Sequence, residues 1–149
     1  MSSEVWPADE AELASLVAGF RACTLPKERW THAAHLATAL VHVREVGPEA
    51  ALAAMRAGID RYNRSLGNVT GYHDTLTIAW MSIVAAYSAE HAARATLDVA
   101  RTLVADVGQR ERPLRYYTKE LLMADAARAA YVGPDLAPLP FVFASLTSG

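Results

Sequence analysis

Apolar residues recur along most of this chain at the three- and four-residue spacing of an amphipathic helix. No run of β-branched residues alternates strictly with polar residues, so no sheet is expected. Alanine, the best helix former, is abundant throughout. The pattern therefore predicts an all-α protein.

Glycine, proline and capping residues divide this pattern into helices. The first helix is expected at residues 8–23. The second should start between residues 26 and 31 and end at residue 47. Three more should cover residues 48–65, 72–87 and 89–107. Gly47 suits the position after a helix end, and Pro48 suits the first turn of the next helix. Ser88 is the expected N-cap of the fifth helix. A further helix, short or bent, is expected between Leu114 and Tyr131.

Prolines dominate the last part of the chain. From Gly133 onward they predict an extended strap, and the apolar side chains within it suggest that it packs against the helices. These side chains are Leu136, Leu139, Phe141 and Phe143. Together the elements predict a single helical domain over residues 1–149, an antiparallel bundle of five to six helices with an extended C-terminal strap.

Composition narrows the class of protein. The 149 residues fit one domain, and 52% hydrophobic with 20% charged residues exclude intrinsic disorder. Cys23 is the single cysteine, so no intramolecular disulfide can form. The N-terminal residues lack a signal-peptide pattern, and no apolar run reaches the about 18 residues of a membrane span. A cytoplasmic protein without a membrane partner is expected.

The charge pattern argues against a nucleic-acid partner. The net charge is −2, and basic residues are scattered among acids along every segment. The densest basic run, residues 109–115, is short and contains Glu111. A nucleic-acid-binding surface normally concentrates basic residues on one face.

Three histidines form the main candidate site. His32 and His35 lie one helical turn apart, so their Cβ atoms are about 5–6 Å from each other and the rings could share an ion. His73 lies where a loop leads into the fourth expected helix, whereas His32 and His35 belong to the second. If those two helices touch, the three imidazoles could hold one divalent transition metal and leave coordination positions open for water or substrate. Imidazole does not identify the metal.

Further candidates surround these histidines. Tyr72 and Asp74 could transfer protons next to His73. The candidate substrate-binding residues are Arg115, Trp80 and Tyr116. Arg115 could bind a carboxylate, and Trp80 shares a helix face with His73. The Glu-x-x-His pattern of di-iron bundles, the His-Glu-x-x-His pattern of zinc proteases and glycine-rich phosphate loops are all absent.

Three short blocks carry a resemblance. They are Trp30–Leu36, Gly71–Thr75 and Pro134–Pro140. In combination they resemble an uncharacterised family of small bacterial helical proteins with a WTHxxHL … GYHxT … PDLxPLP pattern. The resemblance spans most of the chain. It implies that the three blocks belong together and implies no substrate.

Three functional hypotheses follow. The first is a small metal-dependent enzyme or metal-binding helical protein that uses His32, His35 and His73 on a small-molecule substrate. The second is a metal-free enzyme or small-molecule-binding module in which the histidines act as acid–base or ligand-binding groups. The third is an interaction or regulatory protein, such as a helical homodimer, in which the histidines are incidental.

Overall fold

The computed structural model describes residues 7–147, and these residues form helices without any strand. The α-helices are α1 (Glu10–Arg21), α2 (His32–Val46), α3 (Pro48–Ser65), α4 (Asp74–Glu90), α5 (Thr96–Val107), α6 (Lys119–Leu122), α7 (Asp125–Ala129) and α8 (Ala144–Thr147). Two short 3-10 helices, η1 (Lys27–Arg29) and η2 (Arg112–Arg115), lie between them. The all-α prediction is confirmed.

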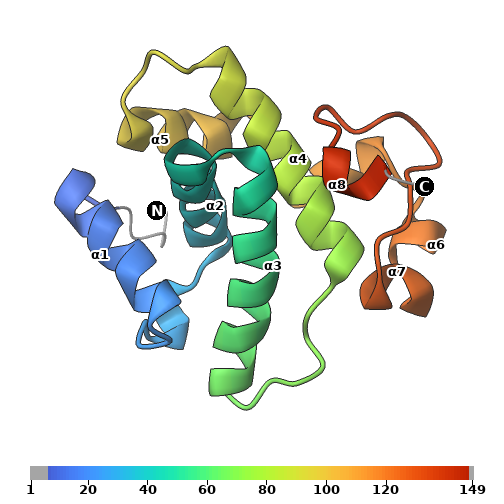
Figure 1. Cartoon of the computed structure of the whole chain (residues 1–149), viewed down its shortest axis with the longest axis horizontal. Coiled ribbons are helices and arrows are strands. Elements are labelled where there is room, and N and C mark those ends of the chain that lie inside the picture. Colours follow the sequence, from blue (N-terminus) through green and yellow to red (C-terminus); the bar gives the residue numbers. More distant parts are fainter. Residues whose placement is uncertain (1–6, 148–149) are drawn as a thin grey trace.

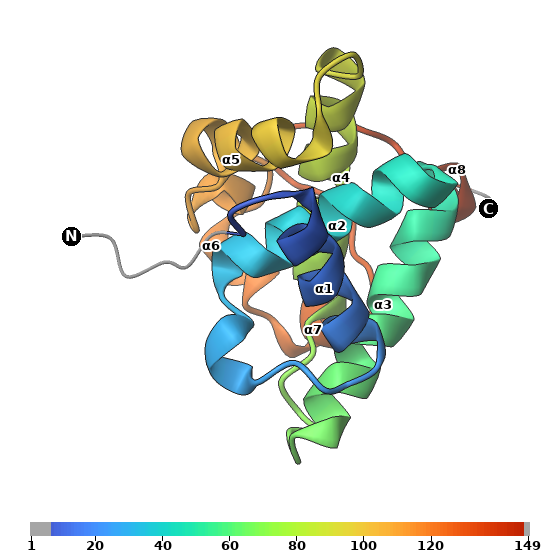
Figure 2. The ribbon, with the colours of Figure 1, turned by 90° about the vertical axis from the view of Figure 1, so that its left-hand side faces the viewer.

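Helix α2 lies at the centre of the molecule. It contacts α1, α3, α4 and α5, which surround it in both ribbon views (Figures 1 and 2). Ala37 and Leu40 in its middle are completely buried. Small residues along α2, such as Ala37 and Ala39, allow its neighbours to approach closely, and α2 and its neighbours share one hydrophobic core.

Helix α4 joins this core to the C-terminal part of the chain. A second, smaller apolar cluster lies on its other side and consists of Ala79, Tyr117, Leu122 and Leu139. The Thr75 hydroxyl donates to the Ala130 carbonyl and accepts from the Val132 amide. The Ser82 hydroxyl makes the same pair of bonds with the backbone of Phe141. The segment that follows α7 is therefore held against α4 at two points.

Several predicted boundaries are confirmed. The third helix covers residues 48–65 as expected, with Pro48 in its first turn. Gly47 ends α2 as expected. Its φ of 85° is positive, which favours glycine, but its ψ of 163° differs from the left-handed helical cap expected from the sequence. The first helix is shorter than predicted because the Asp9 side chain accepts from the Glu12 amide and starts it at Glu10.

The predicted boundary at Ser88 is wrong. Ser88 lies inside α4, which ends at Glu90, and α5 starts only at Thr96. Ser88 is buried, and its hydroxyl accepts from Arg44 of α2. A tertiary contact therefore satisfies the side chain that local preference assigned to a cap. Helix α4 also begins at Asp74 rather than Tyr72, since His73 is its N-cap.

The region from 114 to 131 is more broken than the single helix expected there. It contains part of η2 and the short helices α6 and α7. Thr118 caps α6, and Asp135 accepts from both the amide and the hydroxyl of Thr118. This long-range capping, which a local pattern does not reveal, fixes a new helix start within the region.

Arg44 fastens α2 to the connection between α4 and α5. Its guanidinium donates to the carbonyls of His91 and Arg94 and to the Thr96 hydroxyl, at 2.6–3.3 Å. We expect Arg44→Met to lower the free energy of unfolding by about 2 kcal/mol, because these acceptors lose a charged donor. Urea denaturation checks this. Arg94→Met, which removes an exposed guanidinium, is the control, and an equal loss in both variants would contradict the role of Arg44.

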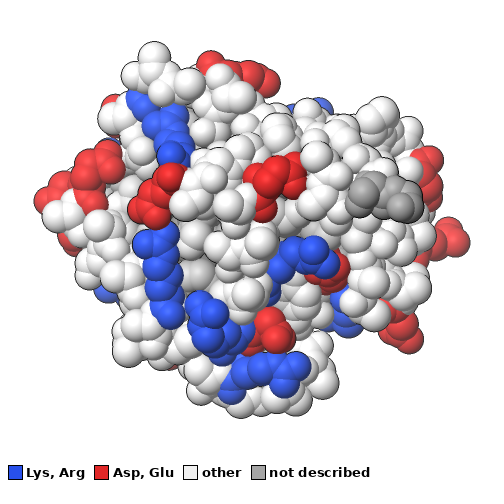
Figure 3. All heavy atoms as spheres, viewed as in Figure 1, with Lys and Arg blue, Asp and Glu red and all other residues white. Residues whose placement is uncertain are grey.

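Charged side chains of both signs are interspersed on the face seen in Figure 3. Two exposed ion pairs among the described residues join Arg21 to Glu45 at 2.6 Å and Arg64 to Asp60 at 3.0 Å. Such exposed pairs contribute little to stability. No helix among residues 7–147 combines the length and the apolar character needed to cross a membrane.

Candidate functional site

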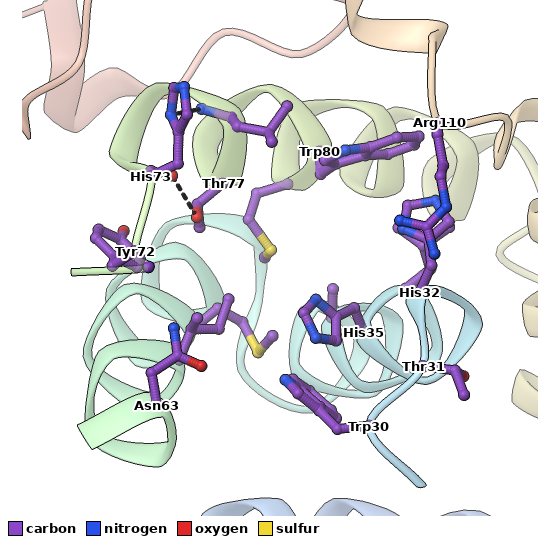
Figure 4. Close-up of a pocket in the computed structure, with 17 residues that line it drawn as sticks. Trp30, Thr31, His32, His35, Asn63, Tyr72, His73, Thr77, Trp80 and Arg110 are labelled. Atoms are coloured by element: carbon purple, nitrogen blue, oxygen red, sulfur yellow. Dashed lines mark hydrogen bonds between the residues drawn. The ribbon is translucent and has the colours of Figure 1, made fainter. Parts of the chain in front are cut away.

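A cavity of about 500 Å³ lies between α2, α3 and α4, with the loop after α5 at one edge. Its volume falls within the range of small-molecule sites, roughly 300–1,000 Å³. The side chains around it are shown in Figure 4. They come from Trp30, Thr31, His32, His35, Leu36, Ala39, Met55, Ile59, Asn63, Gly71, Tyr72, His73, Leu76, Thr77, Trp80, Met81 and Arg110. Two of the three sequence blocks, around His32 and His73, thus meet at one cavity.

Rigid aromatic packing forms the wall beside the start of α2. The Trp30 ring stacks on Phe20 with centroids 4.5 Å apart and meets the edge of Tyr62 at 5.4 Å. The Trp30 indole nitrogen is buried without a hydrogen-bond partner among the described residues. The wall is therefore fixed in place, and it carries one unused donor.

His35 lies at the centre of the cavity in Figure 4. The Thr31 hydroxyl accepts from the Ala34 amide and starts α2, which turns His35 toward α3 and α4. The His35 ring packs against Trp30 with centroids 3.9 Å apart. None of the residues 7–147 makes a hydrogen bond to either ring nitrogen of His35. Both nitrogens are thus open to a ligand.

The environment of His35 keeps its ring neutral. Burial, together with smaller effects of the nearby His32 and Arg110, lowers the pKa of His35 from 6.5 to about 3. At neutral pH the ring therefore offers one N–H donor and one lone-pair acceptor rather than a positive charge.

His32 fastens α2 to the end of α5. Its Nε2 lies 2.8 Å from the Gly108 carbonyl oxygen, and its ring meets the edge of Trp80 at 4.9 Å. Figure 4 places His32 below Arg110 at one edge of the cavity. His32 thus helps to shape the cavity, with one ring nitrogen committed to the backbone.

His73 uses both of its ring nitrogens within the protein. Nδ1 accepts from the Leu76 amide at 3.1 Å and caps α4, and Nε2 donates to the Leu122 carbonyl at 2.8 Å. The first bond fixes the tautomer of the second nitrogen, because an acceptor nitrogen carries no proton. His73 therefore joins α4 to α6 and has no free lone pair for a metal.

Tyr72 and Asp74, the predicted proton-transfer residues, belong to one network with Arg56. The Tyr72 hydroxyl donates to Asp74 at 2.7 Å, and Arg56 binds both oxygens of Asp74 at 2.8 and 2.9 Å. Burial and the Asp74 carboxylate raise the pKa of Tyr72. Tyr72 lines the cavity as a neutral phenol, whereas Asp74 is buried outside the lining.

The three predicted substrate-binding residues do not lie together in the structure. Trp80 lines the cavity. Arg115 is exposed and Tyr116 packs against the second apolar cluster, and neither is part of the lining. Sequence reasoning missed Arg110 and Asn63, which do line it. The single signal for Arg110 was its place in the basic run 109–115, which says nothing about a cavity.

The described residues do not fit a three-histidine metal site. Among residues 7–147, no three His, Cys, Asp or Glu side chains are grouped closely enough to hold an ion. His32, His35 and His73 all border the same cavity, but His73 lies across it from the other two in Figure 4. Its nitrogens are engaged as described above.

Comparison with known proteins yields no match: no family model, no curated protein and no solved structure is significantly similar to this chain. The geometry of the cavity therefore has to support any functional argument by itself.

Proposed function

We propose that this protein binds a small, mainly apolar molecule in the cavity between α2, α3 and α4, and that His35 hydrogen-bonds it. The observation that supports this most is the His35 ring, which faces a cavity of about 500 Å³ with both nitrogens unused by the described residues. Buried polar groups are normally hydrogen-bonded. A ligand that supplies the missing partners is favoured at this position.

The lining fits such a ligand. Apolar and aromatic side chains make up most of it, including Leu36, Met55 and Trp80. A few polar groups, among them Asn63 and Thr77, are placed between them. This mixture of apolar walls with a small number of polar groups is typical of small-molecule sites.

Binding is better supported than acid–base catalysis. An efficient general base has a pKa near the working pH. The pKa of His35 is lowered to about 3, so at neutral pH its ring is a weak base but a competent hydrogen-bonding group. The proposal is therefore a binding protein or binding domain, with catalysis as the less favoured alternative.

A fragment screen by ligand-detected NMR, followed by amide shift mapping, tests the proposal. We expect hits whose shifts map to residues of the cavity lining. His35→Phe keeps a ring of similar size but removes both nitrogens, so affinity should fall about five- to tenfold, the value of one neutral hydrogen bond. His91→Gln, at the far end of α4 and outside the cavity lining, should leave affinity unchanged. Hits that map elsewhere, or equal binding by His35→Phe, would overturn the proposal.

The metal-dependent enzyme stays a prediction from sequence with less support. It would need His73 to release Leu76 or Leu122, because both of its ring nitrogens are already bonded. Elemental analysis of the untagged protein checks it directly. One equivalent of a transition metal in wild type that is lost in His35→Ala would restore it.

Three further predictions from the sequence also remain proposals. They are an antiparallel bundle closed by a C-terminal strap, a cytoplasmic location, and the absence of a nucleic-acid partner. A helical homodimer is the alternative in which the cavity is incidental, and light scattering of the purified protein tests it.

A further inference from the structure

The charge of the cavity lining is unbalanced. No Asp or Glu among residues 7–147 lines the cavity, whereas Arg110 does. If the cavity binds a small molecule as proposed above, on which this inference rests, the charge of its lining selects the charge of the ligand. A cavity with one cation and no carboxylate favours a ligand with a negative charge over a neutral or cationic one.

Arg110 is available to such a ligand. Its side chain is exposed at the edge of the cavity, and it makes no ion pair or hydrogen bond with any residue between 7 and 147. Figure 4 shows it reaching down toward His32, on the side away from Tyr72 and Asn63. Arg56, which lies beside Tyr72, is by contrast already paired with Asp74. An unpaired guanidinium is a ready bidentate partner for a carboxylate.

The rest of the lining specifies an apolar body for the ligand. The aliphatic and thioether side chains that face the cavity are Leu36, Met55, Ile59, Leu76 and Met81. Methionine side chains adapt to different shapes, so either a ring or a chain can fit against them. Trp80 adds an aromatic wall next to Arg110 in Figure 4.

The opposite side of the cavity is polar but uncharged. Asn63, Tyr72 and Thr77 lie there in Figure 4. The side-chain amide of Asn63 makes no hydrogen bond with any described residue. Thr77 donates to the His73 carbonyl. The second end of the ligand therefore meets neutral hydrogen-bonding groups and no second cation. A dianionic phosphate or a dicarboxylate would leave charge unmatched.

We infer that the cavity binds an apolar organic monocarboxylate. The carboxylate lies between Arg110 and His35, whose ring N–H donates to one of its oxygens, and the apolar body lies against the methionines and Trp80. The ligand class covers aromatic acids and medium-chain aliphatic acids, which share the chemistry that this lining recognises.

Isothermal titration with matched probes tests the inference. The acids are 1-naphthoate for the ring and octanoate for the chain, and each is compared with its own neutral amide. 1-Naphthylmethylamine supplies the cationic control. We expect at least one acid to bind about tenfold or more tightly than its amide, with the amine weakest, and added salt to reduce this preference because Arg110 is exposed. The better acid identifies ring or chain.

Variants locate the charge that is recognised. Arg110→Gln should abolish the preference for acid over amide while the amide still binds, and Arg110→Lys should retain part of it, since an ammonium keeps the charge but loses the bidentate geometry. Arg115→Gln is the matched control. It removes a nearby exposed arginine outside the cavity and should change nothing.

The outcomes separate this inference from the proposed function. Equal affinity for acid and amide, tighter binding of the amine, or a preference that survives Arg110→Gln would each overturn the monocarboxylate inference. The cavity would still be a binding site if the amides bind there in a manner that depends on His35. If no probe binds, the inference fails, and the fragment screen described above decides the proposed function.

Discussion

Acidification from about pH 6.5 to about pH 4 is expected to destabilise the wild-type protein by up to about 3 kcal/mol more than it destabilises His35→Phe. The reason is that burial lowers the pKa of His35 from 6.5 to about 3 in the folded protein. In the unfolded chain the ring keeps its ordinary pKa. The two states therefore differ in proton uptake over this range of pH.

The direction follows from that difference. As the pH falls through 6.5, the unfolded chain binds a proton at His35, whereas the folded protein does not until the pH approaches 3. The stabilisation of the folded protein by the neutral His35 ring is fully present above pH 6.5 and is lost progressively as the pH falls. His42 has its pKa lowered by burial as well, but it is present in both proteins and cancels in the comparison.

Urea denaturation at a series of pH values measures this effect. The free energy of unfolding of wild type minus that of His35→Phe should fall steadily as the pH is lowered from about 6.5 to about 4. If the free energies of unfolding of the two proteins change in parallel with pH over this range, the His35 ring is hydrated or charged in the folded protein. The neutral, open imidazole at the centre of the account would then be wrong.

His73→Ala is expected to lower the free energy of unfolding by about 3 kcal/mol. It removes the cap that accepts from the Leu76 amide and leaves the Leu122 carbonyl without its donor. The Leu122 side chain is buried in the second apolar cluster, so water compensates poorly for that loss. The change should therefore loosen α6 from α4.

Two further variants separate these contributions. His73→Asn can still cap α4 but cannot reach Leu122, so its loss should be intermediate. His91→Ala removes a half-buried ring at the other end of α4 that contacts Tyr87 at 4.3 Å, and should cost less than about 1 kcal/mol. A loss in His73→Ala no larger than in His91→Ala would contradict the structural role. Zinc that stabilises wild type but not His73→Ala would favour the metal site instead.

The sequence predicted the helices well where local signals dominate. Gly47 and Pro48 are such signals, because the backbone conformation that each prefers is also the one it adopts. Ser88 was misassigned since a cap and a buried hydroxyl look the same in a sequence. Its partner is Arg44, 44 residues away.

The candidate site could be predicted only in part for the same reason. The spacing of His32 and His35 and the block around His73 correctly indicated side chains that border one cavity. Spacing gives no information about the acceptor that each ring finds. The carbonyls of Gly108 and Leu122 engage His32 and His73, and only the folded chain brings them there. Arg110 lies on a loop whose position no periodicity specifies.

The most direct test of the account is imidazole ¹⁵N NMR of the wild-type protein, with and without the best ligand from the screen. We expect His35 to be neutral at neutral pH and its ring resonances to move when the ligand binds. The His73 ring should keep its proton on Nε2 throughout. A ligand that binds in the cavity and leaves both His35 nitrogens unchanged would contradict the claim that His35 recognises it.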